Sequence, residues 1–198
     1  KNASLKIYDQ KVFYFPKFFH PDPTVKRQTG FLVPKLQDNS SSGLSLNLPY
    51  FFALAENKDI TISPRFFLND KFLLQSEFRQ KNKKSFHLAD ISQYISNNDN
   101  LKGHFFYDFN KKYKTENYDD IDLNIEIQQV TDETYLKAFK VESPIIKNKT
   151  KLKNLLSLDL YKDTLSINTS FDVYEDLSKK DSDKFEYVPN FSFSNIIS

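Results

Sequence analysis

The chain has 198 residues, of which 39% are hydrophobic and 27% charged, with a formal net charge of +2. This balance excludes a strongly basic nucleic-acid-binding protein and a disordered polyelectrolyte. The absence of Cys excludes disulfides and cysteine-ligated metals within the chain, while 20 Phe and 11 Tyr against 3 Gly favour β structure.

The first thirty residues predict two short strands and a connection. Residues 4–8 and 11–16 alternate around a turn, and they are followed by a Pro-rich, polar stretch at 20–30. Residues 31–43 end in QDNSSSG and predict a linker. Because the chain has no Met and begins within a predicted strand, we interpret it as an internal segment of a longer protein.

From residue 44 the pattern predicts an antiparallel meander. LSLNLPYFFALAENKDITISPRFFL, residues 44–68, alternates apolar and polar positions like two strands, yet each strand contains a proline, Pro49 and Pro64. Proline cannot donate to a β-ladder and normally lies on edges, at strand starts or at bulges. Further strands are predicted at 72–79, 84–94, 102–112, 121–128, 134–141, 151–161, 165–173 and 185–195, and no helix is predicted.

The alternation is compatible with two environments. Strands of about 10 residues with one apolar face are typical of membrane-crossing β-strands, and no run of about 18 apolar residues predicts a transmembrane helix. A soluble β-sandwich with one wet face produces the same alternation. The period of the pattern does not distinguish the two.

Three segments carry a family resemblance. FHPDPTVKRQTGFLVP (19–34), SGLSLNLPYFFALAENKDITISPRFF (42–67) and LLQSEFRQ (73–80) resemble the outer-membrane lipopolysaccharide-assembly family LptD, also called Imp or OstA. VTDETYLKAF (130–139) and FEYVPNFSFS (185–194) resemble later barrel segments of the same family more loosely.

The resemblance implies a fold and a division into domains. The expected fold is all-β: an antiparallel meander forming part of a transmembrane β-barrel, preceded by the last strands of a periplasmic β-jellyroll. Residues 1–30 would end the jellyroll, residues 31–43 would be the linker, and residues 44–198 would be the first barrel strands. The implied location is the outer membrane, with the N-terminal part in the periplasm.

The resemblance also implies a function and partners. Lipopolysaccharide (LPS) would be received from an LptA-like periplasmic bridge and inserted into the outer leaflet through a lateral opening of the barrel. An LptE-like lipoprotein would plug the lumen. No enzymatic chemistry, cofactor, metal or nucleic acid is expected.

The two prolines match the family's gate positions. A barrel that opens sideways needs one weak seam, and a proline removes a hydrogen-bond donor there. The resemblance therefore implies a lateral gate at Pro49 and Pro64. It further implies a jellyroll–barrel junction at Pro21, Asp22, Pro23, Lys26, Arg27, Gly30 and Phe31, and a lipid path along Phe13, Phe15, Tyr50 and Phe52.

Other functions have weaker support in the residues. His20, His87 and His104 are scattered without metal-ligand spacing, and the chain has no phosphate loop, nucleophile elbow or dinucleotide fingerprint. Two alternatives stay open: another outer-membrane barrel, such as a solute channel, and a soluble carbohydrate-binding β-sandwich.

Overall fold

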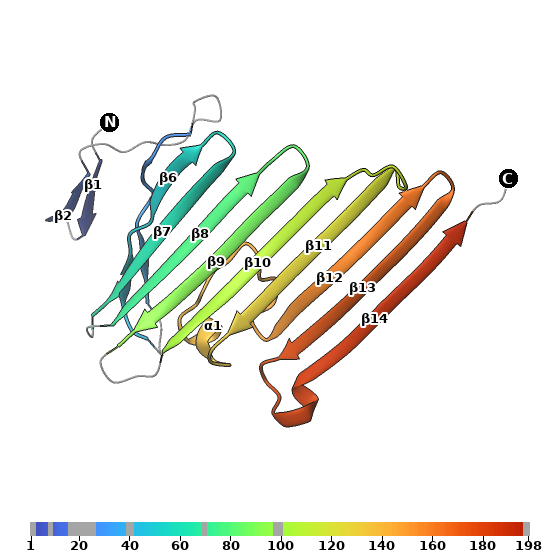
Figure 1. Ribbon diagram of the computed structural model, residues 1–198. Coiled ribbons are helices and arrows are strands. Elements are labelled where there is room, and N and C mark those ends of the chain that lie inside the picture. The colour runs from blue at the N-terminus through green and yellow to red at the C-terminus, as the bar shows by residue number, and fades with distance from the viewer. Residues whose placement is uncertain are drawn as a thin grey trace.

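The structure, a computed structural model, describes residues 3–7, 10–15, 27–38, 42–68, 71–96 and 101–195. The side chains of 3–7, 10–15, 181 and 182 are outside this description. β-strands are the main secondary structure of the described residues, and the helices among them are two four-residue turns, so the predicted all-β class is confirmed (Figure 1).

Twelve of the described strands form one antiparallel sheet, and two more form a separate hairpin. The order in the large sheet is β14-β13-β12-β11-β10-β9-β8-β7-β5-β4, while β6 pairs with β7 and β3. The predicted meander is therefore confirmed. The hairpin is β1 (Ala3–Ile7) and β2 (Gln10–Phe15), and the large sheet contains β3 (Gly30–Phe31), β4 (Lys35–Gln37), β5 (Ser45–Asn47), β6 (Tyr50–Ala55), β7 (Lys58–Phe67), β8 (Phe72–Lys81), β9 (Ser85–Ile95), β10 (Lys102–Tyr113), β11 (Asp120–Val130), β12 (Lys151–Lys162), β13 (Leu165–Asp176) and β14 (Phe185–Asn195).

One predicted strand is wrong. Residues 134–141 contain a helical turn, α1 (Tyr135–Ala138), within the long connection between β11 and β12. Tyr135, Leu136 and Phe139 place their side chains on one side of this turn, where all three are buried. Their spacing is helical, and the connection has a sheet surface to pack on, so burial of this face outweighs an extended conformation. A short 3-10 helix, η1 (Asp181–Lys184), joins β13 to β14.

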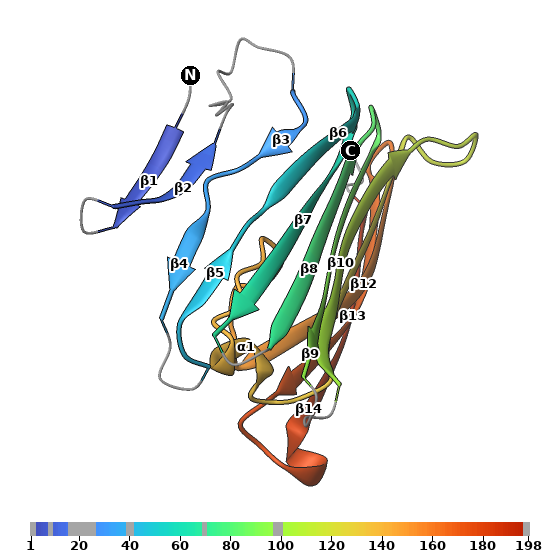
Figure 2. The same ribbon diagram turned by 90° about the vertical axis from the view of Figure 1, so that its left-hand side faces the viewer.

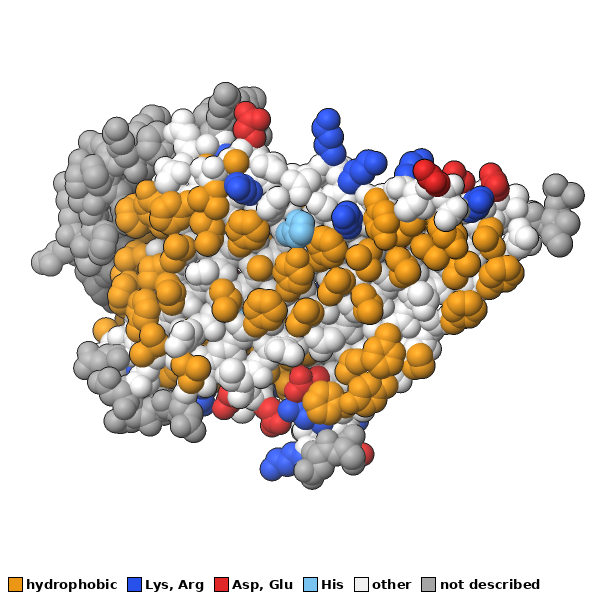
Figure 3. Space-filling view, viewed as in Figure 1, with side chains coloured by type: hydrophobic (Ala, Val, Ile, Leu, Met, Phe, Trp, Pro, Cys, Tyr) orange, Lys and Arg blue, Asp and Glu red, His pale blue; other side chains and the backbone are white. Residues whose placement is uncertain are grey.

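The two faces of the large sheet differ in chemistry. We call the face on which α1 packs the inner face and the opposite face the outer face (Figure 2). Figure 3 shows a broad hydrophobic band over the outer face, with charged side chains gathered at the ends of the strands. The band contains large side chains that stay exposed, among them Phe66, Ile91, Phe105, Leu156, Phe171 and Phe191.

The inner face is polar along part of its length and apolar at one end. Register places Asp59, Glu77, Asp90, Asp122 and Asp159 on this face. At the end where β11 leaves the sheet, the inner face becomes apolar, and the α1 connection covers it. The resulting core includes Phe67, Leu73, Leu88, Tyr94, Phe106, Tyr135, Leu136, Phe139, Val141, Ile145, Leu152 and Leu177.

Candidate functional site: a proline-interrupted sheet edge

Pro64 removes a hydrogen bond between the first two long strands. The register of β5 and β6 against β7 places Leu48 opposite Pro64. The Leu48 N–H donates to the Pro64 carbonyl at 3.0 Å. In an antiparallel ladder such a pair normally exchanges two hydrogen bonds, but Pro64 has no N–H to return the second. This pair is therefore only half bonded.

Pro49 has the same effect on the other side of its strand. The Leu32 N–H donates to the Pro49 carbonyl at 2.8 Å, and Pro49 cannot donate back. Pro49 also divides the predicted first strand into β5 and β6. The register of both pieces against β7 is nevertheless continuous, since Asn47 pairs with Arg65 and Tyr50 pairs with Ile62. The proline thus weakens the ladder without shifting its register.

A third proline lies in the neighbouring edge. Phe31 pairs with Tyr50 and Lys35 pairs with Asn47, so residues 32–34 face the shorter stretch of Leu48 and Pro49. This two-against-three arrangement is a β-bulge, and Pro34 lies within it. Residues 31–43, predicted as a linker, therefore include β4 and the end of β3, both paired to the sheet. We call residues 30–38 and 42–49, which pair with one another and with β7, the proline edge.

A groove opens on the inner face beside the proline edge. Its volume is about 570 Å³, and it is lined by Leu32, Lys35, Asn47, Pro49, Ser63, Arg65, Gln75, Glu77, Glu142 and Pro144 among others. The two faces separate the prolines. Pro49 lines this groove, whereas register places Pro64 on the outer face, two residues from the exposed Phe66.

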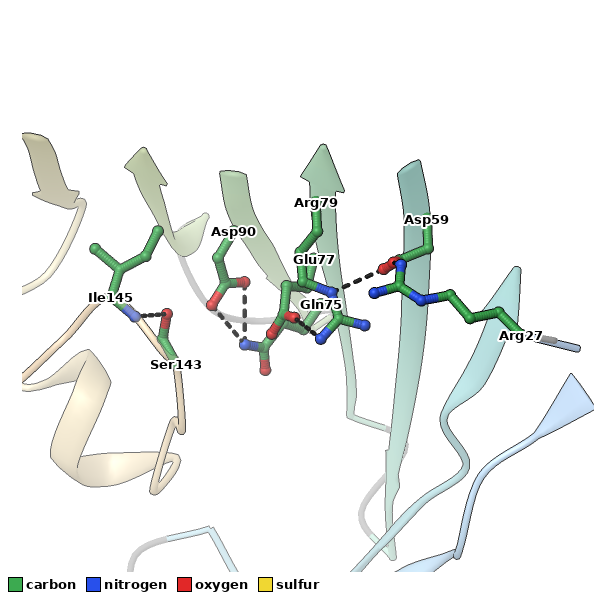
Figure 4. Close-up of polar contacts among 8 residues, drawn as sticks. All are labelled: Arg27, Asp59, Gln75, Glu77, Arg79, Asp90, Ser143 and Ile145. Atoms are coloured by element: carbon green, nitrogen blue, oxygen red, sulfur yellow. Dashed lines mark hydrogen bonds and ion pairs between the residues drawn. The ribbon is translucent and has the colours of Figure 1, made fainter. Parts of the chain in front are cut away.

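Charged side chains link the proline edge to the strands beneath it (Figure 4). Asp59 of β7 is completely buried, and Arg79 Nε of β8 donates to its Oδ1 at 2.7 Å. Arg27, just before β3, forms a second ion pair with Asp59 Oδ2. Arg79 also lies 3.3 Å from the Glu77 carboxylate. The ion pair of Arg27 crosses β6, so it joins the outermost segment to β7.

A second polar group lies deeper on the inner face. Gln75 Nε2 donates to both oxygens of Asp90 at 3.0 Å, and His104 Nε2 lies 3.2 Å from Asp90 Oδ1. His104 Nδ1 and Ser92 Oγ are 2.6 Å apart, and the Tyr135 hydroxyl lies 2.5 Å from Ser92 Oγ. An Asp-His-Ser series is typical of nucleophilic catalysis. Here Asp90, His104 and Ser92 are all buried. The Tyr135 hydroxyl occupies the position beside Ser92 Oγ, so these side chains form a buried polar group within the core.

The buried guanidinium of Arg65 connects strand and α1 connection. Arg65 is 5% exposed, and its Nη1 donates to the Phe139 carbonyl at 2.6 Å. Among the described residues its Nε has no hydrogen-bond partner, and Arg65 lines the groove at the proline edge. A buried guanidinium with an unpaired Nε is unusual, and it places a positive charge at this groove.

The structure places the predicted site residues in three groups. Pro49, Pro64, Gly30 and Phe31 lie together at the proline edge, and Arg27 reaches it through Asp59. Tyr50 and Phe52 lie on the outer face, where their rings are 4.6 Å apart. Phe13 and Phe15 belong to β2, whose side chains are outside the description. The remaining predicted junction residues lie outside the described residues: Pro21, Asp22, Pro23 and Lys26.

The sequence analysis missed the inner-face residues Asp59, Arg65, Gln75 and the α1 connection. Each of the first three occupies a polar position of an alternating strand, which by itself predicts only a solvated face. The helical spacing of Tyr135, Leu136 and Phe139 was the signal for α1. Within the described ranges, no cluster of three His, Asp or Glu residues could hold a metal ion.

None of the described helices has the length and apolar character needed to cross a membrane.

Comparison with known proteins yields one consistent group of relatives. No protein-family model matches the chain. It is 26% identical over 196 residues to the LPS-assembly protein LptD of Pseudoalteromonas atlantica, covering 99% of this chain and 25% of the relative. It is 32% identical over 139 residues to LptD of Pseudoalteromonas translucida, covering 68% of the chain and 18% of the relative.

A shorter region is more similar. The chain is 40% identical over 84 residues to LptD of Ectopseudomonas mendocina, which is 42% of this chain and 9% of that relative. The chain spans no more than about a quarter of the length of these curated relatives. The similarity extends along nearly the whole chain and includes several proteins with the same description. This chain belongs to the LptD family of LPS-assembly proteins.

Proposed function

We propose that the chain forms part of an outer-membrane β-barrel that transports LPS and inserts it into the outer leaflet through a lateral opening at the proline edge. The observation that carries this proposal is the pair of half-bonded contacts, Leu48 with Pro64 and Leu32 with Pro49. The strand pairs on the two sides of Leu48 and Pro49 therefore each lack one backbone N–H donor, at adjacent positions along the strand. Each missing hydrogen bond lowers the cost of separation by about 0.5–1.5 kcal/mol.

The outer face supports a membrane location. Its large apolar side chains remain 41–53% exposed at Ile91, Phe105, Leu156 and Phe171, where a soluble β-sandwich would bury them against a second sheet. Strands β9 to β14 are 11 or 12 residues long, which is close to the length that crosses a bilayer at a tilt. These features favour the barrel over the soluble carbohydrate-binding alternative.

A barrel requires more strands than these. Within the described part of the chain, β14 pairs with β13 alone, and an open strand edge is costly in lipid. The remainder of a full-length protein, about three quarters of the relatives' length, would supply the closing strands. The complete protein would also carry the jellyroll, contact an LptA-like bridge protein and receive an LptE-like plug. The role is transport without catalysis.

The test uses cells in which the full-length protein can be depleted. Arrival of newly made LPS at the cell surface is followed after supplying back wild type, Pro49→Ala/Pro64→Ala, or Pro189→Ala. Pro189 lies in β14, far along the sheet from the proline edge, and is the matched control. We expect wild type and Pro189→Ala to restore arrival and the double variant to restore it more slowly at equal protein levels.

Two results would contradict the proposal in different ways. Unchanged surface LPS after depletion would refute LPS transport and leave a solute channel as the better function. Full restoration by the double variant would refute the lateral opening at this edge while leaving transport intact.

A further inference from the structure

Residues 131–150, which we call the strap, are held firmly on the inner face. Tyr135, Leu136 and Val141 are completely buried, and Phe139 and Ile145 are nearly so. The core that they share includes residues of β7, β8, β9 and β10, together with Leu152 of β12 and Leu177. Burial of large apolar side chains is strongly favourable, so this part of the strap does not leave the sheet easily.

Hydrogen bonds to the strap backbone fix its position. Arg65 Nη1 of β7 donates to the Phe139 carbonyl at 2.6 Å, and Gln75 Nε2 of β8 donates to the Glu142 carbonyl at 2.9 Å. Both donors come from the strands that follow the first strand of the meander. The strap is therefore fixed to the part of the sheet that begins at β7.

The strap also reaches the proline edge, but through weaker contacts. Lys35 Nζ of β4 lies 3.1 Å from Glu142 Oε2, and the two side chains are 56% and 64% exposed. Lys140 Nζ donates to the Asp38 carbonyl at 2.8 Å on the surface. Exposed contacts of this kind contribute little and break easily compared with the packed core.

We propose that the strap is a releasable latch that restrains movement of the proline edge through its contacts from Glu142 to Lys35 and from Lys140 to the Asp38 carbonyl. The inference rests on the proposed function, because it assigns a restraint to the same opening. The apolar side chains of the strap are fixed in the hydrophobic core. Its Lys140 and Glu142 side chains contact the proline edge at the surface. Since β5 and β6 are short of hydrogen bonds to their neighbours, these contacts are additional ties between the edge and the inner face.

Two unequal contacts hold the segment 27–38. Arg27 holds its start through the buried Asp59, whereas Lys35 and Asp38 hold its end through the exposed strap contacts. Release of the strap contacts would free the end near β4 first. The buried tie at Asp59 would keep the segment attached.

The test measures backbone hydrogen–deuterium exchange in the full-length protein purified in detergent, comparing wild type with Lys35→Glu, Glu142→Lys and the double charge reversal. We expect each single reversal to raise amide exchange in residues 32–38 and 42–48 about two- to fivefold, because an exposed ion pair is lost. The double reversal should return exchange to the wild-type rate. Exchange in β9 should stay constant throughout.

The matched control is the exposed pair Lys112–Asp122, at 3.0 Å between β10 and β11, reversed in the same way. Reversals there should leave exchange in residues 32–38 and 42–48 unchanged. If a charge reversal prevents assembly, Lys35→Gln and Glu142→Gln remove the pair without repulsion and should give a smaller increase. Wild-type exchange in all single variants, or no recovery in the double reversal, would overturn the latch.

This outcome is separable from the proposed function. Exchange is measured without LPS, so it tests the latch independently of transport. If the charge reversals change exchange but depletion leaves surface LPS unaffected, the latch contacts are supported and the transport role is refuted. Unchanged exchange alongside blocked LPS arrival after depletion would refute the latch and keep the transport role.

Discussion

Arg79 Nε lies 2.7 Å from Asp59 Oδ1, and this carboxylate is completely buried on the inner face of the sheet. Arg27 binds the other oxygen of the same carboxylate. A buried carboxylate is stable only when it is paired and hydrogen-bonded. The edge segment before β3 therefore depends on a charge contributed by β7.

Replacing Asp59 with Asn should destabilise the protein by about 1–3 kcal/mol, because hydrogen bonds to charged groups are lost and two guanidinium groups lose their counter-charge. The midpoint of heat-induced unfolding, followed by gel mobility of the full-length protein, measures the effect. Asp122→Asn is the control, since among the described residues that carboxylate forms an ion pair with the exposed Lys112 alone. Equal midpoints for the two variants would show that burial of Asp59 has no energetic weight.

Gly103 should tolerate no side chain. A Cβ built at Gly103 would lie 2.2 Å from the Ser92 carbonyl oxygen of β9, whereas a Cβ at Gly30 would have no neighbour within 4 Å. Gly103→Ala should therefore destabilise the β9–β10 hairpin by about 1–3 kcal/mol through overpacking. Gly30→Ala is the control and should leave the unfolding midpoint nearly unchanged. A stable Gly103→Ala protein would mean that the two strands separate there at little cost.

Burial raises the pKa of the Tyr135 hydroxyl to about 12, from the ordinary tyrosine value of 10.0. The unfolded chain loses this proton first as pH rises, so the contribution is complete below about pH 10 and is lost between about pH 10 and 12. The associated loss of stability is about 2–3 kcal/mol. Tyr135→Phe should remove this part of the alkaline decline, measured as unfolding midpoint against pH. The same decline in the variant would assign it to other groups.

Much of the fold was predictable because its strands alternate with period two. Register puts Ile121, Leu123 and Ile125 on the outer face, as their alternation with polar residues indicated. The strap was not predictable in this way, because Tyr135, Leu136 and Phe139 acquire their burial only from a distant sheet surface. Arg65 and Asp59 look like ordinary solvated charges in the sequence. Their burial depends on which segments cross the inner face, and local periodicity does not encode that.

Part of the candidate site was also predictable from local sequence, and part was not. Pro49 and Pro64 interrupt an otherwise regular alternation, so the sequence indicated a weakened pair of strands directly. The pairing of residues 30–37 with β5 and β6 depends on a bulge around Pro34, where a local reading predicts a linker. The tie between Lys35 and Glu142 joins residues 107 positions apart. Such a contact follows from the folded topology and from no local motif.

Lys140 offers a test that separates backbone strain from the latch. Its φ of 46° lies in the left-handed region, which costs a non-glycine residue roughly 1–2 kcal/mol. Lys140→Gly should therefore raise the unfolding midpoint, while the lost contact with the Asp38 carbonyl should raise amide exchange in residues 32–38 and 42–48. Asp163→Gly is the control, because Asp163 has a φ of 50° in the turn between β12 and β13, away from the strap. Asp163→Gly should also raise the unfolding midpoint, but it should leave exchange in residues 32–38 and 42–48 unchanged. If both variants leave exchange at the proline edge unaltered, the Lys140 side chain does not restrain the proline edge.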